Sequence, residues 1–134
     1  MKLWFAPLAI AVLATTPAHA QECNESSNQH ELHVCADEAY KKTNAELNTT
    51  YQEIMGRLKD DDPTREMLVK AQRAWLAFRD AECDFATFAA KDGSIWPMLN
   101  LQCLGALTAK RIIDLKVYLN CEEGDMSCPV PAPQ

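Results

Sequence analysis

Residues 71–83 read Ala-Gln-Arg-Ala-Trp-Leu-Ala-Phe-Arg-Asp-Ala-Glu-Cys, and this stretch decides the fold. It contains no glycine or proline, and its apolar residues recur at steps of three and four, as in an amphipathic α-helix. The same steps continue on both sides of the stretch. They predict one stripe facing the core, formed by Met67, Ala71, Ala74, Phe78, Ala81, Phe85 and Phe88, with Trp75 beside it. We therefore expect a helix of about residues 63–91.

Two further segments have the same periodicity. Asn28 stands three residues before Glu31, which is the spacing of a capping box, and the apolar steps that follow predict a helix of about 28–59. Pro97 suits the first turn of a third helix of about 97–119. Three helices with short connections predict an all-α, disulfide-stapled, three-helix up-down-up bundle.

The connections carry their own signals. In the run Asp60-Asp61-Asp62-Pro63, Asp62 is the expected N-cap and Pro63 the expected first helical residue of the second helix. Gly93 is the expected stop at the end of that helix. Both connections should therefore be tight turns at opposite ends of the bundle.

The two ends of the chain differ from the middle. Residues 1–20 combine an early Lys2, a short apolar run and Ala18-His19-Ala20, which is typical of a cleaved secretory signal rather than a membrane anchor. The helical domain should then cover 21–120. Residues 121–134 should form a small cystine loop and a flexible proline-rich tail. We expect a periplasmic or secreted protein without a membrane anchor.

The charge restricts the class of partner. The chain has 13 basic and 19 acidic residues, a net charge of −6, and removal of Lys2 with the signal leaves 12 − 19 = −7. This balance argues against nucleic acid, which needs clustered Lys and Arg, and favours encounter with a basic protein. We find no glycine-rich phosphate loop and no nucleophile-and-base motif, so we expect no cofactor and no catalytic residues.

Six cysteines in a short exported chain indicate three disulfides. Cys83 and Cys103 each lie ten residues from Gly93, so antiparallel packing places them level, and this pair is our first choice. Cys121–Cys128 is the natural local pair, which leaves Cys23–Cys35. The alternative is Cys35–Cys83 with Cys23–Cys103. A metal site is not expected, because His30, His33 and Cys35 have no second ligand pair nearby.

Several polar residues are expected in the helix seams. On a helical wheel, Glu82 falls within the apolar stripe of the second helix, and Arg111 falls between apolar residues of the third. A buried charge must be paired, and Arg79 is one turn before Glu82. We interpret Gln72, Arg79, Glu82 and Arg111 as a structural polar network rather than an acid–base site.

The same residues carry a resemblance to a known family. Cys35, Leu47-Asn48 with Tyr51, the run from Gln72 to Cys83, Gly93-Ser94, Cys103, and Thr108 with Arg111 and Leu115 resemble the LprI-type lysozyme inhibitor family. The resemblance covers about residues 23–119. Three features depart from it: the context of Cys23 does not suit lipid attachment, Asn44 stands where an acid is expected, and Cys121 and Cys128 are additional.

The resemblance implies a protein that binds and blocks a lysozyme-like muramidase, a glycan hydrolase, and is not an enzyme itself. The candidate binding surface is the turn formed by Lys91, Asp92, Gly93, Ser94 and Trp96. The other candidate is the acidic turn Asp60-Asp61-Asp62, which otherwise serves as a solvated helix start. Trp96 either anchors in a sugar subsite or covers the end of the bundle. The competing hypotheses are a periplasmic structural or envelope-stress protein with another partner, and a hydrolase that depends on Glu82.

Overall fold

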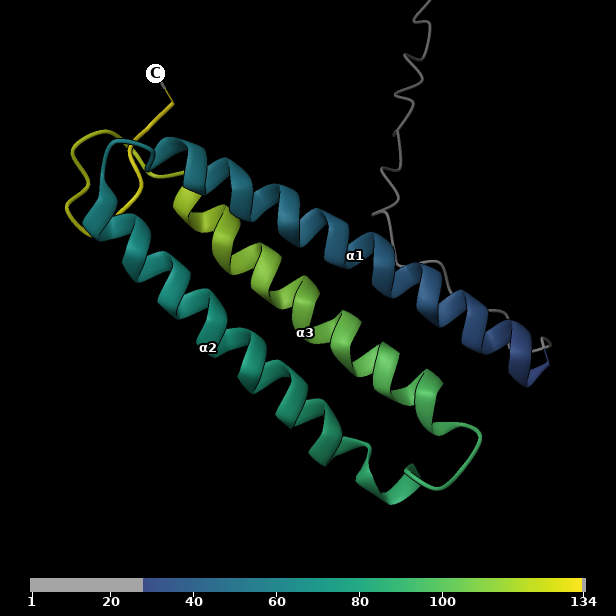
Figure 1. The fold of residues 1–134 in the computed structure, drawn as a ribbon. Coiled ribbons are helices and arrows are strands. Elements are labelled where there is room, and N and C mark those ends of the chain that lie inside the picture. Colours follow the sequence, from purple (N-terminus) through teal and green to yellow (C-terminus); the bar gives the residue numbers. More distant parts are fainter. Residues whose placement is uncertain (1–27, 134) are drawn as a thin grey trace, which may run out of the picture.

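The computed structural model describes residues 28–133 and contains the predicted all-α, three-helix bundle (Figure 1). Its helices agree with the predicted ones to within a few residues at most ends. The elements are α1 (Gln29–Arg57), α2 (Asp62–Ala86), the short 3-10 helix η1 (Phe88–Ala90) and α3 (Trp96–Leu119).

Local sequence explains most of the helix ends. Asn28 caps α1 and forms the complete capping box with Glu31. α2 begins one residue earlier than predicted, because Asp61 rather than Asp62 accepts the hydrogen bond from the backbone N–H of Thr64. The α2 helix also ends at Ala86 rather than near residue 91, since the chain tightens there into the 3-10 turn.

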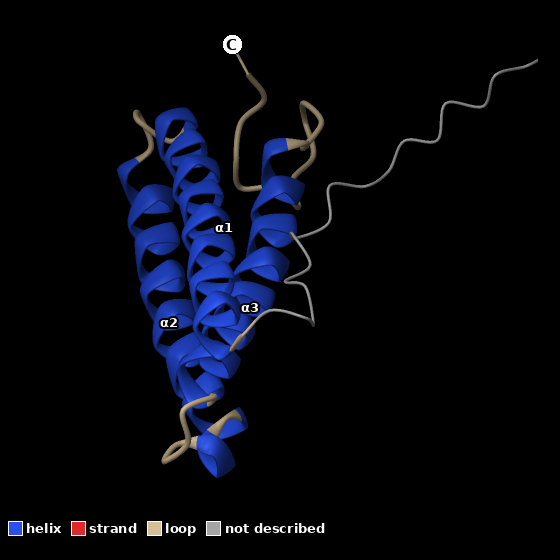
Figure 2. Ribbon diagram, turned by 90° about the vertical axis from the view of Figure 1, so that its right-hand side faces the viewer, coloured by secondary structure: helices blue, strands red, loops and turns tan. Residues whose placement is uncertain are grey.

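The helices run up, down and up, with the connections gathered at the two ends of the bundle (Figure 2). α1 and α3 run parallel to each other and form the main helix–helix interface. Polar contacts tie this interface on its surface: Lys116 Nζ lies 2.7 Å from Glu46 Oε1. Arg57 donates to the backbone carbonyl of Leu119, one of the free carbonyls at the end of α3.

The apolar core lies toward the end of the bundle where α1 turns into α2. Its buried members come from the end of α1, from α3 and from the C-terminal tail: Leu47, Ile54, Leu58, Ile112, Leu115 and Val130. The presence of Val130 corrects our expectation for residues 121–134. The tail is not free along its length, because it folds back and places Val130 in the core.

Two predicted disulfides are present. Cys83–Cys103 joins α2 to α3, with the Cα atoms 5.6 Å apart, and Cys121–Cys128 closes the loop after α3. The first of these excludes the alternative pairing of Cys83 with Cys35. The predicted Cys23–Cys35 bond and the predicted signal of residues 1–20 lie outside the described residues.

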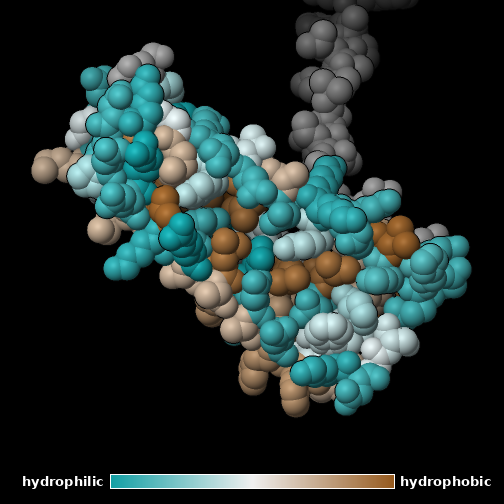
Figure 3. All heavy atoms as spheres, viewed as in Figure 1, coloured by the Kyte–Doolittle hydropathy of each residue, from teal (hydrophilic) through white to brown (hydrophobic). Residues whose placement is uncertain are grey.

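The rotation of α2 about its axis differs from our prediction. The predicted core stripe faces solvent: Met67, Phe78, Phe85 and Phe88 are 65%, 55%, 79% and 67% exposed. Tan apolar side chains accordingly follow the edge of the molecule where α2 lies (Figure 3). The buried side of α2 instead carries Gln72, Arg79 and Cys83. Within residues 28–133, no helix has the length and apolar character needed to cross a bilayer.

Candidate functional site

Next to the apolar core, two guanidinium groups lie close to the ring of Trp75. The Arg79 and Arg111 guanidinium carbons are 5.3 Å and 5.8 Å from the ring centroid, which is the geometry of a cation–π contact. Arg111 Nε also donates to Gln72 Oε1 at 3.0 Å. Gln72, Arg79 and Arg111, which we assigned to a polar network, therefore meet around one tryptophan.

Arg79 is the most heavily used polar residue of this layer. Its Nε and Nη2 donate to Asp80 Oδ1 at 2.9 Å and 2.7 Å, and its Nη1 lies 3.4 Å from Thr108 Oγ1. The ring of Tyr40 on α1 is 5.9 Å from the guanidinium carbon. Contacts to all three helices meet at this one cation. Such an arrangement compensates the cost of burying the charge and positions the helices relative to one another.

Glu82 does not belong to this layer, which corrects our assignment. Its side chain is exposed, and the carboxylate beside Arg79 comes from the adjacent Asp80. The reason is the rotation of α2, which turns the predicted stripe and Glu82 together toward solvent. In addition, no group of three or more His, Cys, Asp or Glu side chains suited to a metal ion occurs within residues 28–133.

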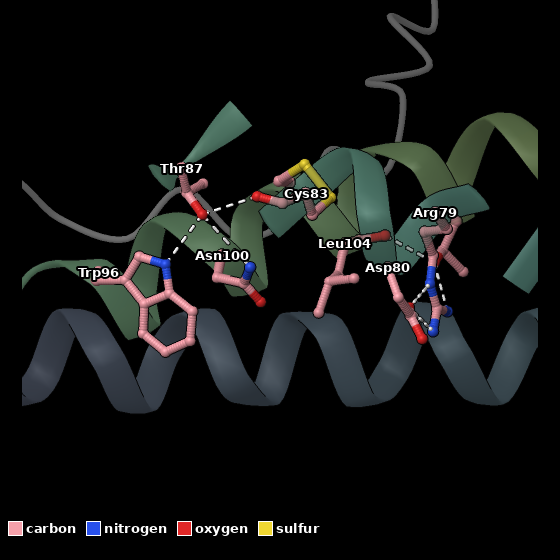
Figure 4. The surroundings of a disulfide bond; sticks show 9 residues. Arg79, Asp80, Cys83, Thr87, Trp96, Asn100 and Leu104 are labelled. Carbon is pink, nitrogen blue, oxygen red and sulfur yellow. Dashed lines mark hydrogen bonds and ion pairs between the residues drawn. A yellow bond between two sulfur atoms is a disulfide. The ribbon is translucent and has the colours of Figure 1, made fainter. Parts of the chain in front are cut away.

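Beyond the disulfide, Thr87 holds the far end of the bundle together (Figure 4). Its hydroxyl donates to the carbonyl of Cys83 at 2.7 Å and accepts from Trp96 Nε1 at 3.0 Å and Asn100 Nδ2 at 3.4 Å. A hydroxyl offers one donor and two acceptor positions, so all of its capacity is used. The residue is buried and links the last turn of α2 to the first turns of α3.

Trp96 consequently covers the end of the bundle. Its ring is half-buried, and its only polar atom is already bonded to Thr87. Of our two interpretations of Trp96, this bond favours the cover of the bundle end over the anchor in a sugar subsite. No sequence pattern predicts this contact, because Thr87 and Trp96 meet only when the turn closes.

The turn between η1 and α3 projects beyond this cover. Lys91, Asp92, Gly93, Ser94 and Ile95 are all exposed. The Gly93 N–H donates to the Ala90 carbonyl at 2.8 Å, and the Trp96 N–H donates to the Gly93 carbonyl at 3.1 Å, so the turn is tied at both sides. The Lys91 ammonium lies over the exposed ring of Phe88 at 5.7 Å. This end therefore combines a fixed backbone with exposed cationic, acidic, hydroxyl and apolar groups.

The acidic turn at the opposite end has a structural role. Asp61 caps α2, and Asp62 pairs with Arg65. Hydrogen bonds from the hydroxyl and backbone N–H of Thr64 lower the pKa of the Asp61 carboxyl from its ordinary value. Two of the three acids are thus engaged locally, which favours the turn at Lys91–Ile95 as the candidate binding surface.

A groove between α1 and α3 was not anticipated from the sequence. It encloses about 970 Å³ and is lined by apolar residues such as Val34 and Ile112 and by charged residues such as Glu38 and Lys42. The Lys116–Glu46 ion pair joins two of its lining residues. Helical wheels of single segments do not reveal such a groove, because it exists only where two helices diverge.

Comparisons with known proteins place the chain in a family. It is 37% identical over 131 residues to an uncharacterized protein, R02472, of Rhizobium meliloti (strain 1021), covering 87% of this chain and 94% of that protein. It is 28% identical over 117 residues to the uncharacterized Escherichia coli (strain K12) protein YecT, covering 75% and 70%. No solved structure is matched.

The family model described as lysozyme inhibitor LprI matches residues 20–115. This range contains α1, α2, the Trp75 layer, the Cys83–Cys103 disulfide and most of α3. The chain belongs to the LprI lysozyme inhibitor family.

Proposed function

We propose that this protein binds a lysozyme-like muramidase and blocks its active-site cleft. The observation that carries the proposal is the match of residues 20–115 to the lysozyme inhibitor family. An inhibitor needs no catalytic group. It needs a rigid projection that fills the cleft and excludes the glycan.

The binding surface that fits this task best is the turn Lys91–Ile95. The turn is exposed, and the Cys83–Cys103 disulfide, Thr87 and Trp96 hold it from below. Glycoside hydrolases place two carboxyl groups beside the bond that they cleave. In the proposed complex, Lys91 pairs with these carboxyl groups, and the Ser94 hydroxyl takes the place of a sugar hydroxyl.

The charge of the chain supports rapid encounter. Its net charge is −6, and a basic muramidase would be attracted over distances of about 10 Å at moderate salt. Within this acidic surface, Lys91 stands as a cation at the projecting end. Long-range attraction and the local contact would therefore be supplied by different residues.

The disulfides also agree with the oxidising compartment in which such an inhibitor would act. Disulfides persist in oxidising compartments, and this chain has one between helices and one in the loop after α3. Together with the family match, they suggest an extracellular or periplasmic protein. Export through the signal of residues 1–20 is part of the proposal.

The test is inhibition of cell-wall lysis by muramidases of several types, using protein beginning at residue 21. Lys91→Glu should weaken inhibition at least about tenfold, because it places a like charge against the catalytic carboxyl groups. Lys59→Glu is the matched control, since Lys59 is an exposed lysine beside the opposite turn.

Three outcomes would count against the proposal. Absence of inhibition and binding at micromolar protein with every muramidase would remove the function and favour another periplasmic partner. Equal loss with Lys91→Glu and Lys59→Glu would move the binding surface elsewhere. Glycan or peptide hydrolysis that disappears in a folded Glu82→Gln variant would make the protein an enzyme.

A further inference from the structure

The exposed stripe of α2 is an unpartnered apolar face on an otherwise charged helix. It consists of six residues along one side of the helix: Met67, Ala71, Ala74, Phe78, Ala81 and Phe85. None of the six is charged, and all face solvent. An aromatic side chain presents roughly 200 Å² of surface, so the exposed parts of Phe78 and Phe85 alone amount to roughly 250 Å². With the other four residues, the exposed apolar area of the stripe falls within the roughly 300–600 Å² of the largest apolar patch on a typical monomer.

We propose that this face binds the same face of a second copy of the chain, with the two α2 helices antiparallel. The spacing of large and small residues carries the proposal. Ala71 and Phe85 lie symmetrically about residue 78, so a two-fold axis at Phe78 places each Phe85 ring over Ala71 of the other copy. Ala74 and Ala81 lie symmetrically about almost the same point. The two alanines oppose each other there and leave room for the two Phe78 rings that meet at the axis, at a helix separation of about 8–10 Å.

The flanking charges agree with the same axis. Lys70 and Asp84 are both exposed on one side of the stripe, and neither forms an ion pair within the part of the protomer that the structure describes. They are 14 residues apart, which is about 21 Å along the helix, too far to meet within one chain. In the antiparallel pair each Lys70 faces Asp84 of the other copy, twice by symmetry. In a parallel pair the two-fold axis runs along the helices and places the two Lys70 side chains on opposite sides of the stripe, so neither would meet an Asp84.

The geometry leaves the candidate inhibitory turns accessible. The axis at Phe78 sends the two Lys91–Ile95 turns in opposite directions, away from the paired helices. The dimer would therefore present two separate binding ends. This inference does not depend on the proposed function, because a dimer forms or fails to form without any muramidase present.

The measurement is sedimentation velocity of the purified chain, beginning at residue 21, as a function of its concentration. The stripe is smaller than the roughly 800 Å² per partner of a standard interface, so we expect a dimer with a Kd on the order of 10 µM. Phe78→Glu should weaken it at least about 30-fold, because two apolar groups are lost and two like charges meet at the axis. Ile113→Glu is the matched control: Ile113 is 65% exposed on α3 and lies outside the stripe.

A charge exchange tests the orientation. Lys70→Glu and Asp84→Lys should each weaken the dimer several-fold, and the double variant should restore it, because the two ion pairs form again with reversed sign. Phe78→Glu should keep the helix content and thermal unfolding of the dilute wild-type monomer, since Phe78 is exposed within the protomer.

Other outcomes overturn the proposal. A chain that stays monomeric up to about 300 µM has no such dimer. A dimer that tolerates Phe78→Glu uses another face, and one that the double charge exchange does not restore is not antiparallel. If Phe78→Glu abolishes muramidase inhibition in a chain that is always monomeric, the stripe is the muramidase site instead.

Discussion

The two faces of α2 depart from the usual arrangement of a helix in a bundle. Beside the partly buried Leu68 and Trp75, which pack against the core, the inward face carries the buried residues Gln72, Arg79 and Cys83. The face turned to solvent carries Met67, Phe78 and Phe85. The comparison teaches that specific bonds, rather than the apolar stripe, decide the rotation of this helix.

The magnitudes explain why this rotation can win. Burying Phe78 and Phe85 would stabilise the protomer by about 1.5–3 kcal/mol each. That rotation would turn Cys83 away from Cys103 and lose a disulfide worth about 3 kcal/mol. It would also take Gln72 from Arg111 and Arg79 from Thr108, leaving polar groups in the seam without partners. The exposed stripe can recover its burial from a partner, whereas the disulfide cannot be replaced.

The largest loss of stability should come from removing the Cys83–Cys103 disulfide, which holds α2 in its observed rotation. The double variant Cys83→Ala/Cys103→Ala should lower the free energy of unfolding by about 3 kcal/mol, as expected for a loop closed over 20 residues. Urea unfolding followed by circular dichroism measures it. If stability does not change, the disulfide does not hold α2 in place.

A smaller loss of stability is expected when Arg79, the cation on the buried face of α2, is removed. Arg79→Ala should cost about 2 kcal/mol, because it removes the contacts to Asp80, Thr108 and the ring of Trp75. Phe78→Ala is the matched change on the exposed face and should cost less than about 0.5 kcal/mol in the dilute monomer. A larger cost for Phe78→Ala than for Arg79→Ala would reverse the assignment of the two faces.

The contact between Gln72 and Arg111 can be isolated with a double-mutant cycle. The variants Gln72→Ala, Arg111→Ala and their combination should give a coupling free energy of about 1.5 kcal/mol, the lower end of the range for a hydrogen bond to a charged group. Thermal or urea unfolding of the four proteins supplies the values. Additive effects would show that the two side chains act independently.

The smallest effect concerns the cap at the start of α2, which belongs to neither face. The pKa of Asp61 is lowered in the folded protein by its hydrogen bonds from Thr64, so its contribution is present above the unfolded value of about 3.9. That contribution decreases as the pH falls through the lower folded pKa. Asn also caps helices but does not titrate.

Asp61→Asn should therefore lose less stability than the wild type when the pH is lowered from 5 to 2. Urea unfolding at several pH values measures the difference. Parallel pH profiles for the two proteins would mean that the carboxylate of Asp61 does not contribute through its charge.

Much of the candidate site depends on the same rotation. Cys83 and Cys103 were paired from their distance to the turn, and Arg79 precedes Cys83 by one helical turn, so the disulfide itself indicated which side of α2 faces α3. Reading the helix from this bond would have placed Gln72 and Arg79 inside and Glu82 outside. The apolar periodicity predicts the opposite rotation, because periodicity alone does not distinguish a stripe that faces the core from one that faces outward.

The sequence by itself determined the three helices, their order and the tight turn at Gly93, and it favoured two of the disulfides. These follow from local signals, namely caps, prolines, periodicity and the distance of each cysteine from a turn. Only the tertiary structure decided the rotation of α2, the Thr87–Trp96 contact, the contacts of Trp75 with two arginines and the return of Val130 to the core. The physical reason is that each of these joins residues far apart in the chain, and their bonds form only after the helices have packed.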